Sequence, residues 1–246
     1  MTDERHSRTE MLIGRAAVER LMSARVAIFG IGGVGSYVLE ALVRAGVGSV
    51  VLFDADKVAE SNINRQLIAD YTTVGMAKTD AAEARIRRIS PECEVIKHEV
   101  FVTPEYVAEL DLSGVDFIVD AIDTVSAKLA LAERAEALGI PMIASMGTGN
   151  KLDPCAFEIT DIYKTSVCPL ARAMRTELRK RGVKRLTVLY SKEEPRTPMA
   201  ANGAEKVDTG RRLPPASISY VPAAAGLIIA SHVAKELMKK KEVEQI

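Results

Sequence analysis

Tryptophan is absent from this chain of 246 residues, aromatic residues make up only 4% of it, and there are only three cysteines. Cys93, Cys155 and Cys168 are far apart and form no Cys-x-x-Cys pair. This spacing argues against a disulfide framework and a four-ligand zinc site, and it is typical of a reducing compartment. The first ten residues are strongly charged and contain no apolar core segment. We therefore expect no secretory signal and a cytoplasmic location.

The chain has no excess of charge of either sign, since 33 Lys+Arg balance 33 Asp+Glu, and 48% of its residues are hydrophobic. This composition is typical of a globular protein and indicates no class of partner. It also lacks a long apolar run. The longest, residues 221–233, is interrupted by Pro222, Ser231 and His232, and a membrane span needs about 20 residues. We expect no integral span, and we keep peripheral membrane association through a C-terminal helix as an alternative.

Short apolar runs alternate with amphipathic stretches between residues 25 and 145. The runs at 25–29, 49–54, 94–98, 115–120 and 141–145 predict strands, and the stretches at 34–45, 77–89 and 126–138 predict helices. This βαβα pattern is typical of a parallel sheet with helices on both faces. The predicted fold class is therefore α/β, with a Rossmann-like, mostly parallel sheet flanked by helices.

The pattern changes after residue 146. Strands at 157–161 and 186–191 and a helix at 169–181 predict an antiparallel C-terminal extension, and a helix at 223–241 closes the chain. Residues 192–215 carry four prolines and predict a mobile loop of unusual length. We interpret the whole chain, 1–246, as one domain with a helical arm at 1–24, a core at 25–145 and an extension at 146–246.

A glycine-rich turn follows the first predicted strand, where Gly30, Gly32, Gly33 and Gly35 open a helix. The backbone amides at such a turn donate hydrogen bonds to phosphate oxygens, and the missing side chains let a nucleotide approach. Asp54 follows 24 residues after Gly30, at the end of the second strand. A carboxylate there accepts hydrogen bonds from ribose hydroxyls. The turn and the acid together predict a nucleotide site in the core.

Further polar residues are of the kinds that a triphosphate and Mg²⁺ require, namely cations and an additional carboxylate. They are Asn62, Arg65, Gln66, Lys78, Asp120 and Asp123. Each also has a plain structural interpretation: Arg65 could pair with a surface acid, Lys78 could be a solvated lysine, and Asp123 could cap the next helix. A nicotinamide-dependent oxidoreductase needs only the turn and the ribose acid, so it remains an alternative.

These motifs resemble, in their order, the ThiF/MoeB-like superfamily of ubiquitin-activating-type adenylyltransferases. They are Gly30-x-Gly32-Gly33-x-Gly35, Asp54-x-Asp56, Asn62-x-x-Arg65-Gln66, Lys78 and Asp120-x-x-Asp123. The resemblance spans residue 8 to about residue 145. It implies that a substrate carboxylate attacks the α-phosphate of ATP, which gives an acyl-adenylate and pyrophosphate.

The resemblance also implies the role of individual residues. Asp54 would bind the ribose, Asn62, Arg65 and Lys78 the phosphates, and Asp123 both Mg²⁺ and the attacking carboxylate. Asp56, Gln66, Ile122 and the four glycines would complete the nucleotide site. Arg8 is similar in position to an arginine that the family inserts into the partner subunit's site, which implies a catalytic homodimer. The catalytic set is then Arg8, Arg65, Lys78 and Asp123, and residues 146–246 would serve the substrate and the dimer.

Residues 149–154 and 161–170 and the apolar C-terminal helix resemble one branch of this superfamily, the tRNA threonylcarbamoyladenosine dehydratases. That branch uses ATP to activate the threonyl carboxylate of a modified adenosine in tRNA, and the side chain then closes on itself with loss of AMP. Activators of sulfur-carrier proteins commonly hold zinc with paired Cys-x-x-Cys motifs, which this chain lacks. A sulfur-carrier or sulfur-transfer partner and a non-catalytic nucleotide-binding adaptor remain alternatives.

Two features of the extension need separate interpretation. Seven cations stand between residues 172 and 185 against one acid, and Arg172, Arg175 and Arg179 share a helical face. Such a face suits tRNA phosphates, and an ordinary solvated helix face is the alternative. Cys168 precedes Pro169 at the start of this helix, where the dipole would activate a thiol. The sequence shows no partner for it, and dehydratase chemistry requires none.

Overall fold

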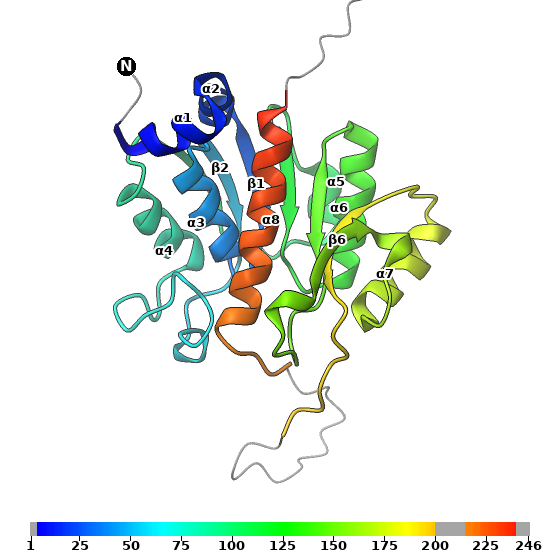
Figure 1. The fold of residues 1–246 in the computed structure, drawn as a ribbon. Coiled ribbons are helices and arrows are strands. Elements are labelled where there is room, and N and C mark those ends of the chain that lie inside the picture. The colour runs from blue at the N-terminus through cyan, green and yellow to red at the C-terminus, as the bar shows by residue number, and fades with distance from the viewer. Residues whose placement is uncertain (1–3, 200–214, 240–246) are drawn as a thin grey trace, which may run out of the picture.

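The computed structural model describes residues 4–199 and 215–239, so most of the predicted loop at 192–215 lies outside the described residues. A seven-stranded sheet in the order β3-β2-β1-β4-β5-β7-β6 forms the centre (Figure 1). The strands are β1 (Arg25–Phe29), β2 (Ser49–Phe53), β3 (Glu94–His98), β4 (Phe117–Asp120), β5 (Met142–Ser145), β6 (Phe157–Asp161) and β7 (Thr187–Ser191). All neighbours pair in parallel except β6 and β7. The predicted fold class is confirmed, including the antiparallel extension.

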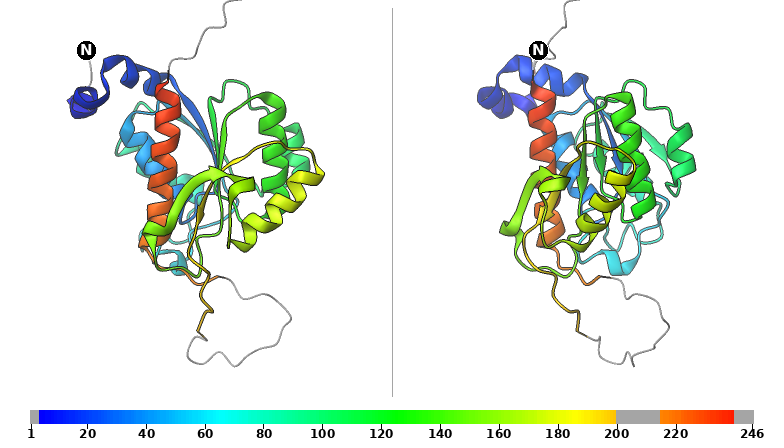
Figure 2. Two further views of the ribbon diagram at one scale, coloured as in Figure 1. Left: turned by 45° about the vertical axis from the view of Figure 1, so that its right-hand side comes forward. Right: turned by 90° about the vertical axis from the view of Figure 1, so that its right-hand side faces the viewer.

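Helices cover both faces of the sheet (Figure 2). They are α1 (Ser7–Ile13), α2 (Arg15–Ser23), α3 (Gly35–Ala45), α4 (Lys78–Arg87), α5 (Pro104–Glu109), α6 (Val125–Leu138), α7 (Pro169–Lys180) and α8 (Tyr220–Met238). One apolar core lies between the sheet and α3, α4 and α8, and the other between the sheet and α5, α6 and α7. Both faces of each central strand are therefore buried, which explains why these strands read as continuous apolar runs.

The short helix α5 is absent from the prediction. Thr103 caps it by accepting a hydrogen bond from Tyr106 N at 3.2 Å, and Pro104 occupies its first turn. These are ordinary helix-start signals. The helix has only six residues, however, and so short a segment shows too little periodicity to be recognised from the sequence.

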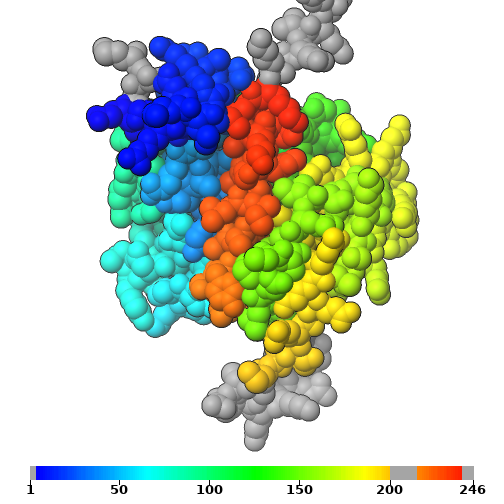
Figure 3. Space-filling model, in the orientation of Figure 1, coloured from blue at the N-terminus to red at the C-terminus, as the bar shows by residue number. Residues whose placement is uncertain are grey.

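α8 begins at Tyr220, three residues before its predicted start, and its described part ends at Met238. It runs along the front of the molecule between the N-terminal and C-terminal halves (Figure 3). A Cβ on Gly226 would lie 2.6 Å from the carbonyl oxygen of Val34 and 2.7 Å from Tyr37 Cβ. The missing side chain therefore lets α8 pack closely on α3 and the turn before it.

Among the described helices, α8 alone has the length and composition of a membrane span, with a mean hydropathy of 1.2. A core helix meets the same criterion. Val221, Ala225, Ile229 and Val233 of α8 are fully buried against the sheet and α3. One face of α8 is therefore part of the core.

The order of the strands opens a crevice beside β1 and β4. The chain moves from β1 to β2 on one side of the sheet and from β4 to β5 on the other. The loops that follow β1 and β4 therefore diverge at the carboxyl edge of the sheet, which is where open α/β sheets bind ligands. The glycine turn follows β1, and residues 121–124 follow β4, so the fold places two of the predicted motifs together.

Candidate nucleotide site

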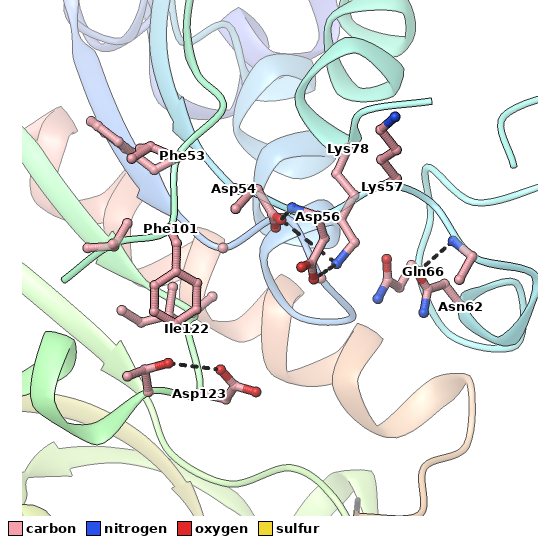
Figure 4. A pocket seen from close by; sticks show the side chains of 18 of the residues that line it. Phe53, Asp54, Asp56, Lys57, Asn62, Gln66, Lys78, Phe101, Ile122 and Asp123 are labelled. Carbon is pink, nitrogen blue, oxygen red and sulfur yellow. Dashed lines mark hydrogen bonds and ion pairs between the residues drawn. The ribbon is translucent and has the colours of Figure 1, made fainter. Parts of the chain in front are cut away.

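A cavity of about 600 Å³ lies at this carboxyl edge (Figure 4). Ligand pockets commonly measure about 300 to 1,000 Å³. The predicted site residues that line it are Gly30, Gly32, Asp54, Asp56, Asn62, Arg65, Gln66, Lys78, Ile122 and Asp123. These residues come from three loops and one helix start, far apart in the sequence, and the fold gathers them around one space.

Asp54 follows β2 and is held in place by two backbone amides. Ile31 N donates to its Oδ2 at 2.7 Å, and Asp56 N donates to its Oδ1 at 2.9 Å. Burial raises the pKa of Asp54, and the ammonium of Lys78 and the two amides oppose that rise. The carboxyl is thus fixed against the first turn of the glycine loop, the position expected for a ribose-binding acid.

Lys78 is the first residue of α4 and is only 6% exposed. Its Nζ lies 2.7 Å from Asp56 Oδ2 and 3.9 Å from Asp54 Oδ1 (Figure 4). A helix N-terminus disfavours a cation, and these carboxylates offset that effect. Lys78 N donates to the Asp56 carbonyl at 2.9 Å, which ties the helix start to the loop after β2. The sequence-based interpretation of Lys78 as a solvated lysine is therefore wrong.

The loop after β2 supplies three more polar side chains. Asn62 Oδ1 accepts a hydrogen bond from Ala59 N at 3.1 Å, which fixes the loop. Arg65 Nη1 donates to the Ser61 carbonyl at 2.9 Å and to Asn64 Oδ1 at 2.8 Å, and no carboxylate of the described residues pairs with it. Gln66 is buried, and its Oε1 has no hydrogen-bond partner within the described chain. The guanidinium charge and the Gln66 acceptor are thus available to a ligand.

The four glycines divide into two pairs. Gly30 and Gly32 line the cavity, and Gly33 and Gly35 do not. A Cβ on Gly33 would lie 3.2 Å from Pro222 Cβ, at the start of α8, and a Cβ on Gly35 would lie 1.8 Å from the carbonyl oxygen of Gly30. Gly33 and Gly35 permit close packing of α8 and of the turn itself, and their part in nucleotide binding stays a prediction.

The opposite part of the cavity is apolar. Phe53, Val100, Phe101, Val102 and Ile122 line it, and the Phe101 ring lies over Ile122 (Figure 4). An apolar slot next to a ribose acid suits a nucleobase. Residues 100–102 were not among the predicted site residues, although they follow the predicted strand at 94–98 and so had to reach the same edge of the sheet. Lys57, which lines the rim, was also missed.

Asp120 does not line the cavity, although it belongs to one of the predicted motifs. Its side chain and that of Lys128, on α6, are both 0% exposed and form an ion pair of 2.9 Å. Asp120 Oδ1 accepts a hydrogen bond from Ile122 N at 3.2 Å, and Lys128 Nζ donates to the Ile122 carbonyl at 3.1 Å. Burial raises the pKa of Asp120, and Lys128 opposes the rise. The pair therefore shapes the loop that carries Ile122 and Asp123.

Asp123 is exposed to the cavity, and its Oδ1 lies 3.5 Å from Thr124 Oγ1. The N-cap residue of α6 is Thr124, so the interpretation of Asp123 as a helix cap is wrong. No group of three or more His, Cys, Asp or Glu side chains in the described residues forms a metal site. Mg²⁺ in nucleotide sites needs only one or two carboxylates beside phosphates and water. Asp123, which has no cation partner among the described residues, fits that requirement.

Arg8 lies outside the cavity of its own chain. It is an exposed residue of α1, at the end of the sheet where β1 begins, whereas the cavity lies where β1 ends (Figure 1). Arg5 joins this arm to the loop before β3 by donating to the Ile89 carbonyl at 2.8 Å and by pairing with Glu92. That pairing lowers the pKa of Glu92 to about 2. Any contact of Arg8 with a nucleotide must therefore come from a second chain.

Cys168 is the N-cap residue of α7 and is only 2% exposed. The buried ammonium of Lys151, whose Nζ donates to the Glu193 carbonyl, interacts electrostatically with it. Burial lowers the pKa of Lys151, and Cys168 and Glu193 oppose that change. Burial keeps the sulfur from a macromolecular substrate, so the structure does not favour a chemical role for this thiol.

This chain is similar to known proteins over nearly its whole length. The model of the ThiF family matches residues 6–246. A tRNA threonylcarbamoyladenosine dehydratase from Bacillus subtilis is 42% identical over 98% of this chain and 97% of its own length. A sulfur carrier protein ThiS adenylyltransferase from the same organism is 37% identical, but over only 59% of this chain and 44% of its own length. The crystal structure of the Escherichia coli tRNA threonylcarbamoyladenosine dehydratase in complex with ATP is similar with a TM-score of 0.84 and 33% identity, covering 96% of this chain and 94% of that one.

Proposed function

This chain belongs to the ThiF family, and from that premise we propose that it is an ATP-dependent tRNA threonylcarbamoyladenosine dehydratase. It adenylates the threonyl carboxylate of the modified adenosine, and the activated side chain then cyclises with release of AMP and pyrophosphate. The observation that carries this proposal is the extent of the similarity. The alignment with a dehydratase covers 98% of this chain, and the alignment with an activator of a sulfur carrier covers 59%. The proposed distinction between a dehydratase and an activator of a sulfur carrier therefore depends mainly on the extension at 146–246.

The cavity suits ATP along its whole length. The apolar slot under Phe101 takes the adenine, Asp54 accepts the ribose hydroxyls, and the amides of the glycine turn face the phosphates. Lys78, Arg65 and Asn62 stand at the polar end. Their positive charges and donors lie where charge develops on the phosphates, and because the fold already holds them there, they need no reorganisation during the reaction.

The reaction joins the substrate carboxylate to the α-phosphate of ATP and expels pyrophosphate. The adenylated carbonyl is then attacked from within the same side chain, and AMP leaves with one former carboxylate oxygen. No external nucleophile is required. This is consistent with the burial of Cys168, the one cysteine that the sequence places at a helix start.

Mg²⁺ is part of this proposal, and Asp123 would hold it next to the phosphates. When bound there, the ion would neutralise phosphate charge and help to orient the triphosphate. Asp123 itself lies next to Ile122 and Phe101 of the apolar slot (Figure 4). It is thus placed to orient the incoming carboxylate group relative to the α-phosphate.

AMP release with defined substrates tests this function. The purified protein, ATP and Mg²⁺ are incubated either with tRNA that carries threonylcarbamoyladenosine or with a Gly-Gly-ended sulfur-carrier protein. We expect AMP and pyrophosphate only with the modified tRNA, together with loss of one water from the nucleoside by mass spectrometry. Release that requires the carrier protein would support the sulfur-carrier alternative, and tight NAD binding without ATP binding would favour an oxidoreductase.

A cytoplasmic homodimer completes the proposal. tRNA modification requires access to tRNA, and Arg8 requires a second chain to reach a nucleotide. The same helix exposes Met11 and Leu12, at 88% and 84%. Two adjacent apolar side chains that exposed are typical of a surface covered by a partner. We therefore place Arg8 of one protomer at the phosphates of its partner.

Subunit mixing tests the role of Arg8 across the dimer. Arg8→Ala and Asp123→Ala chains should each be inactive alone, because each homodimer lacks one group at both sites. Mixed in equal amounts after subunit exchange, they should recover about a quarter of wild-type AMP release, since half the dimers are mixed and each has one intact site. Activity that stays at the level of the separate variants would contradict the trans role, provided that native mass spectrometry confirms the mixed dimer.

A further inference from the structure

Positive charge is concentrated in one short segment of this neutral chain. Residues 162–186 contain eight Lys and Arg and a single acid, Glu177, a net charge of +7, whereas the whole chain has a net charge of 0. The remaining residues therefore carry a net charge of −7. The segment comprises the connection after β6, the helix α7 and the connection to β7. The positive charge therefore belongs to one part of the protein and is hidden in the net charge of the whole chain.

Internal ion pairs neutralise only two of the eight cations. Lys180 pairs with Glu177 at 2.7 Å, and Arg181 pairs with Glu133 at 2.7 Å. Among the described residues, the other six have no carboxylate partner. These six, which we call the α7 basic surface, are Lys164, Arg172, Arg175, Arg179, Lys184 and Arg185. All are exposed except Arg175, which is partly buried and donates to the Thr165 carbonyl at 3.0 Å.

The fold presents these cations outward. Ala171, Met174 and Leu178 form the inner face of α7 and are 0% exposed. Arg172 and Arg179 are seven residues apart on the exposed side, which places them about 10 Å apart along the helix axis. The Arg179 guanidinium lies 5.2 Å from the centre of the Tyr163 ring. Stacking on this ring orients the guanidinium and leaves its N–H groups open to an anion.

The α7 basic surface begins at the same edge of the sheet as the nucleotide cavity. Ser166, just before α7, has its Oγ 3.5 Å from the hydroxyl of Tyr190, the penultimate residue of β7. The helix then runs back toward the beginning of β7 and packs beside α6, whose N-cap residue Thr124 directly follows Asp123 (Figures 1 and 2). A polymer that presents one nucleoside to the ATP in the cavity can therefore extend across α7.

We propose that the α7 basic surface binds the phosphodiester backbone of the tRNA whose modified adenosine presents its carboxylate to the ATP bound in the cavity. This inference rests on the proposed function. Arginine and lysine contacts to phosphates supply affinity through the release of counterions, and they position the nucleic acid without reading its sequence. Reaction with the ATP in the cavity then selects the nucleoside that carries the threonyl carboxylate, and α7 holds the surrounding strand, so affinity and specificity reside on different elements.

Charge reversal on α7 tests the inference. Arg172→Glu and Arg179→Glu are made singly and together, with Arg88→Glu as the matched control, because Arg88 is an exposed arginine at the end of α4. We measure kcat and KM for full-length modified tRNA at several salt concentrations, and the dissociation constant of ATP. The double variant should raise KM for tRNA about tenfold or more, and each single variant should lower the slope of log KM against log salt by about one unit. ATP affinity and kcat should remain at the wild-type level, as should every value for the control.

The outcomes separate this inference from the proposed function. If wild-type protein turns over modified tRNA and the α7 variants keep its KM and salt slope, the inference is wrong and the function stands. If the wild-type protein does not turn over modified tRNA, the proposed function is wrong. If the variants bind tRNA normally but lose binding of an acidic carrier protein, α7 is a protein-docking surface, and the inference is again wrong.

Discussion

Replacing Lys78 by alanine should lower kcat/KM for adenylation by about 10²- to 10³-fold, the loss expected when one fixed donor is removed from a charge-stabilising site. Lys78 is a buried cation of the cavity wall, and its position is set by Asp54, Asp56 and the start of α4. Without it, two neighbouring carboxylates would face the phosphates with no positive charge between them. Exchange of labelled pyrophosphate into ATP measures the effect directly.

Lys57→Ala is the matched control for this substitution. Lys57 lines the same cavity, but its side chain points away from Asp54 and Asp56 (Figure 4). Its removal should change the exchange rate by less than about threefold, since an exposed charge contributes little. Equal losses in both variants would mean that positive charge in general, and not the placement of Lys78, matters at this site.

Lys78→Ala should also raise the pH at which ATP affinity is lost on acidification. Burial raises the pKa of Asp54, and Lys78 lowers it. The pKa should therefore rise further once the ammonium is gone. Ribose binding needs the ionised carboxylate as an acceptor, so affinity falls as the pH drops through this pKa. Titration of ATP affinity from neutral to acidic pH should show the midpoint at a higher pH in Lys78→Ala than in the wild type, and an unchanged midpoint would argue against coupling of the two groups.

Replacing Lys128 by methionine should cost about 3 to 5 kcal/mol of unfolding free energy, because it leaves the buried carboxyl of Asp120 without its cation. Both side chains are 0% exposed, so no water can replace the lost partner. The substitution also removes the hydrogen bond that holds the Ile122 carbonyl. Urea unfolding followed by circular dichroism measures the loss.

A double variant and a surface control sharpen this test. Asp120→Asn combined with Lys128→Met removes the uncompensated charge and should recover part of the stability, which a double-mutant cycle quantifies. Lys180→Met, which breaks the exposed pair with Glu177, should change stability by less than about 1 kcal/mol. A Lys128→Met protein as stable as the surface control would show that the buried pair contributes no net stabilisation.

The strands were predicted more closely than the helix ends. The strands at 25–29, 94–98 and 157–161 have the predicted bounds, because each is a short apolar or β-branched run between turn signals. The helix α8 starts earlier than predicted, because Pro222 fits the first turn of a helix, where no amide is needed. Propensity marks the middle of an element well and its ends poorly, since helix ends depend on what the flanking residues contact.

Ten of the twelve residues predicted to bind the cofactor line one cavity, because they follow parallel strands that end at the same edge of the sheet. The residues that were missed lack such a signal. Phe101 belongs to no polar motif. From the sequence, Lys128 resembles a surface lysine of an amphipathic helix, but in the structure it is buried and paired with Asp120. The position of an ordered motif was thus predictable, and the support that distant residues give it was not.

The sequence by itself determined the fold class, the order of the nucleotide-binding motifs and the excess positive charge of residues 162–186, because periodicity, spacing and composition are local properties. Only the tertiary structure decided that Gly33 and Gly35 serve packing, that Asp120 is paired and buried, and that α7 begins at the edge of the sheet where the cavity opens. Each of these depends on contacts between residues far apart in the chain, and a contact of that kind exists only when the two segments have packed against the same sheet.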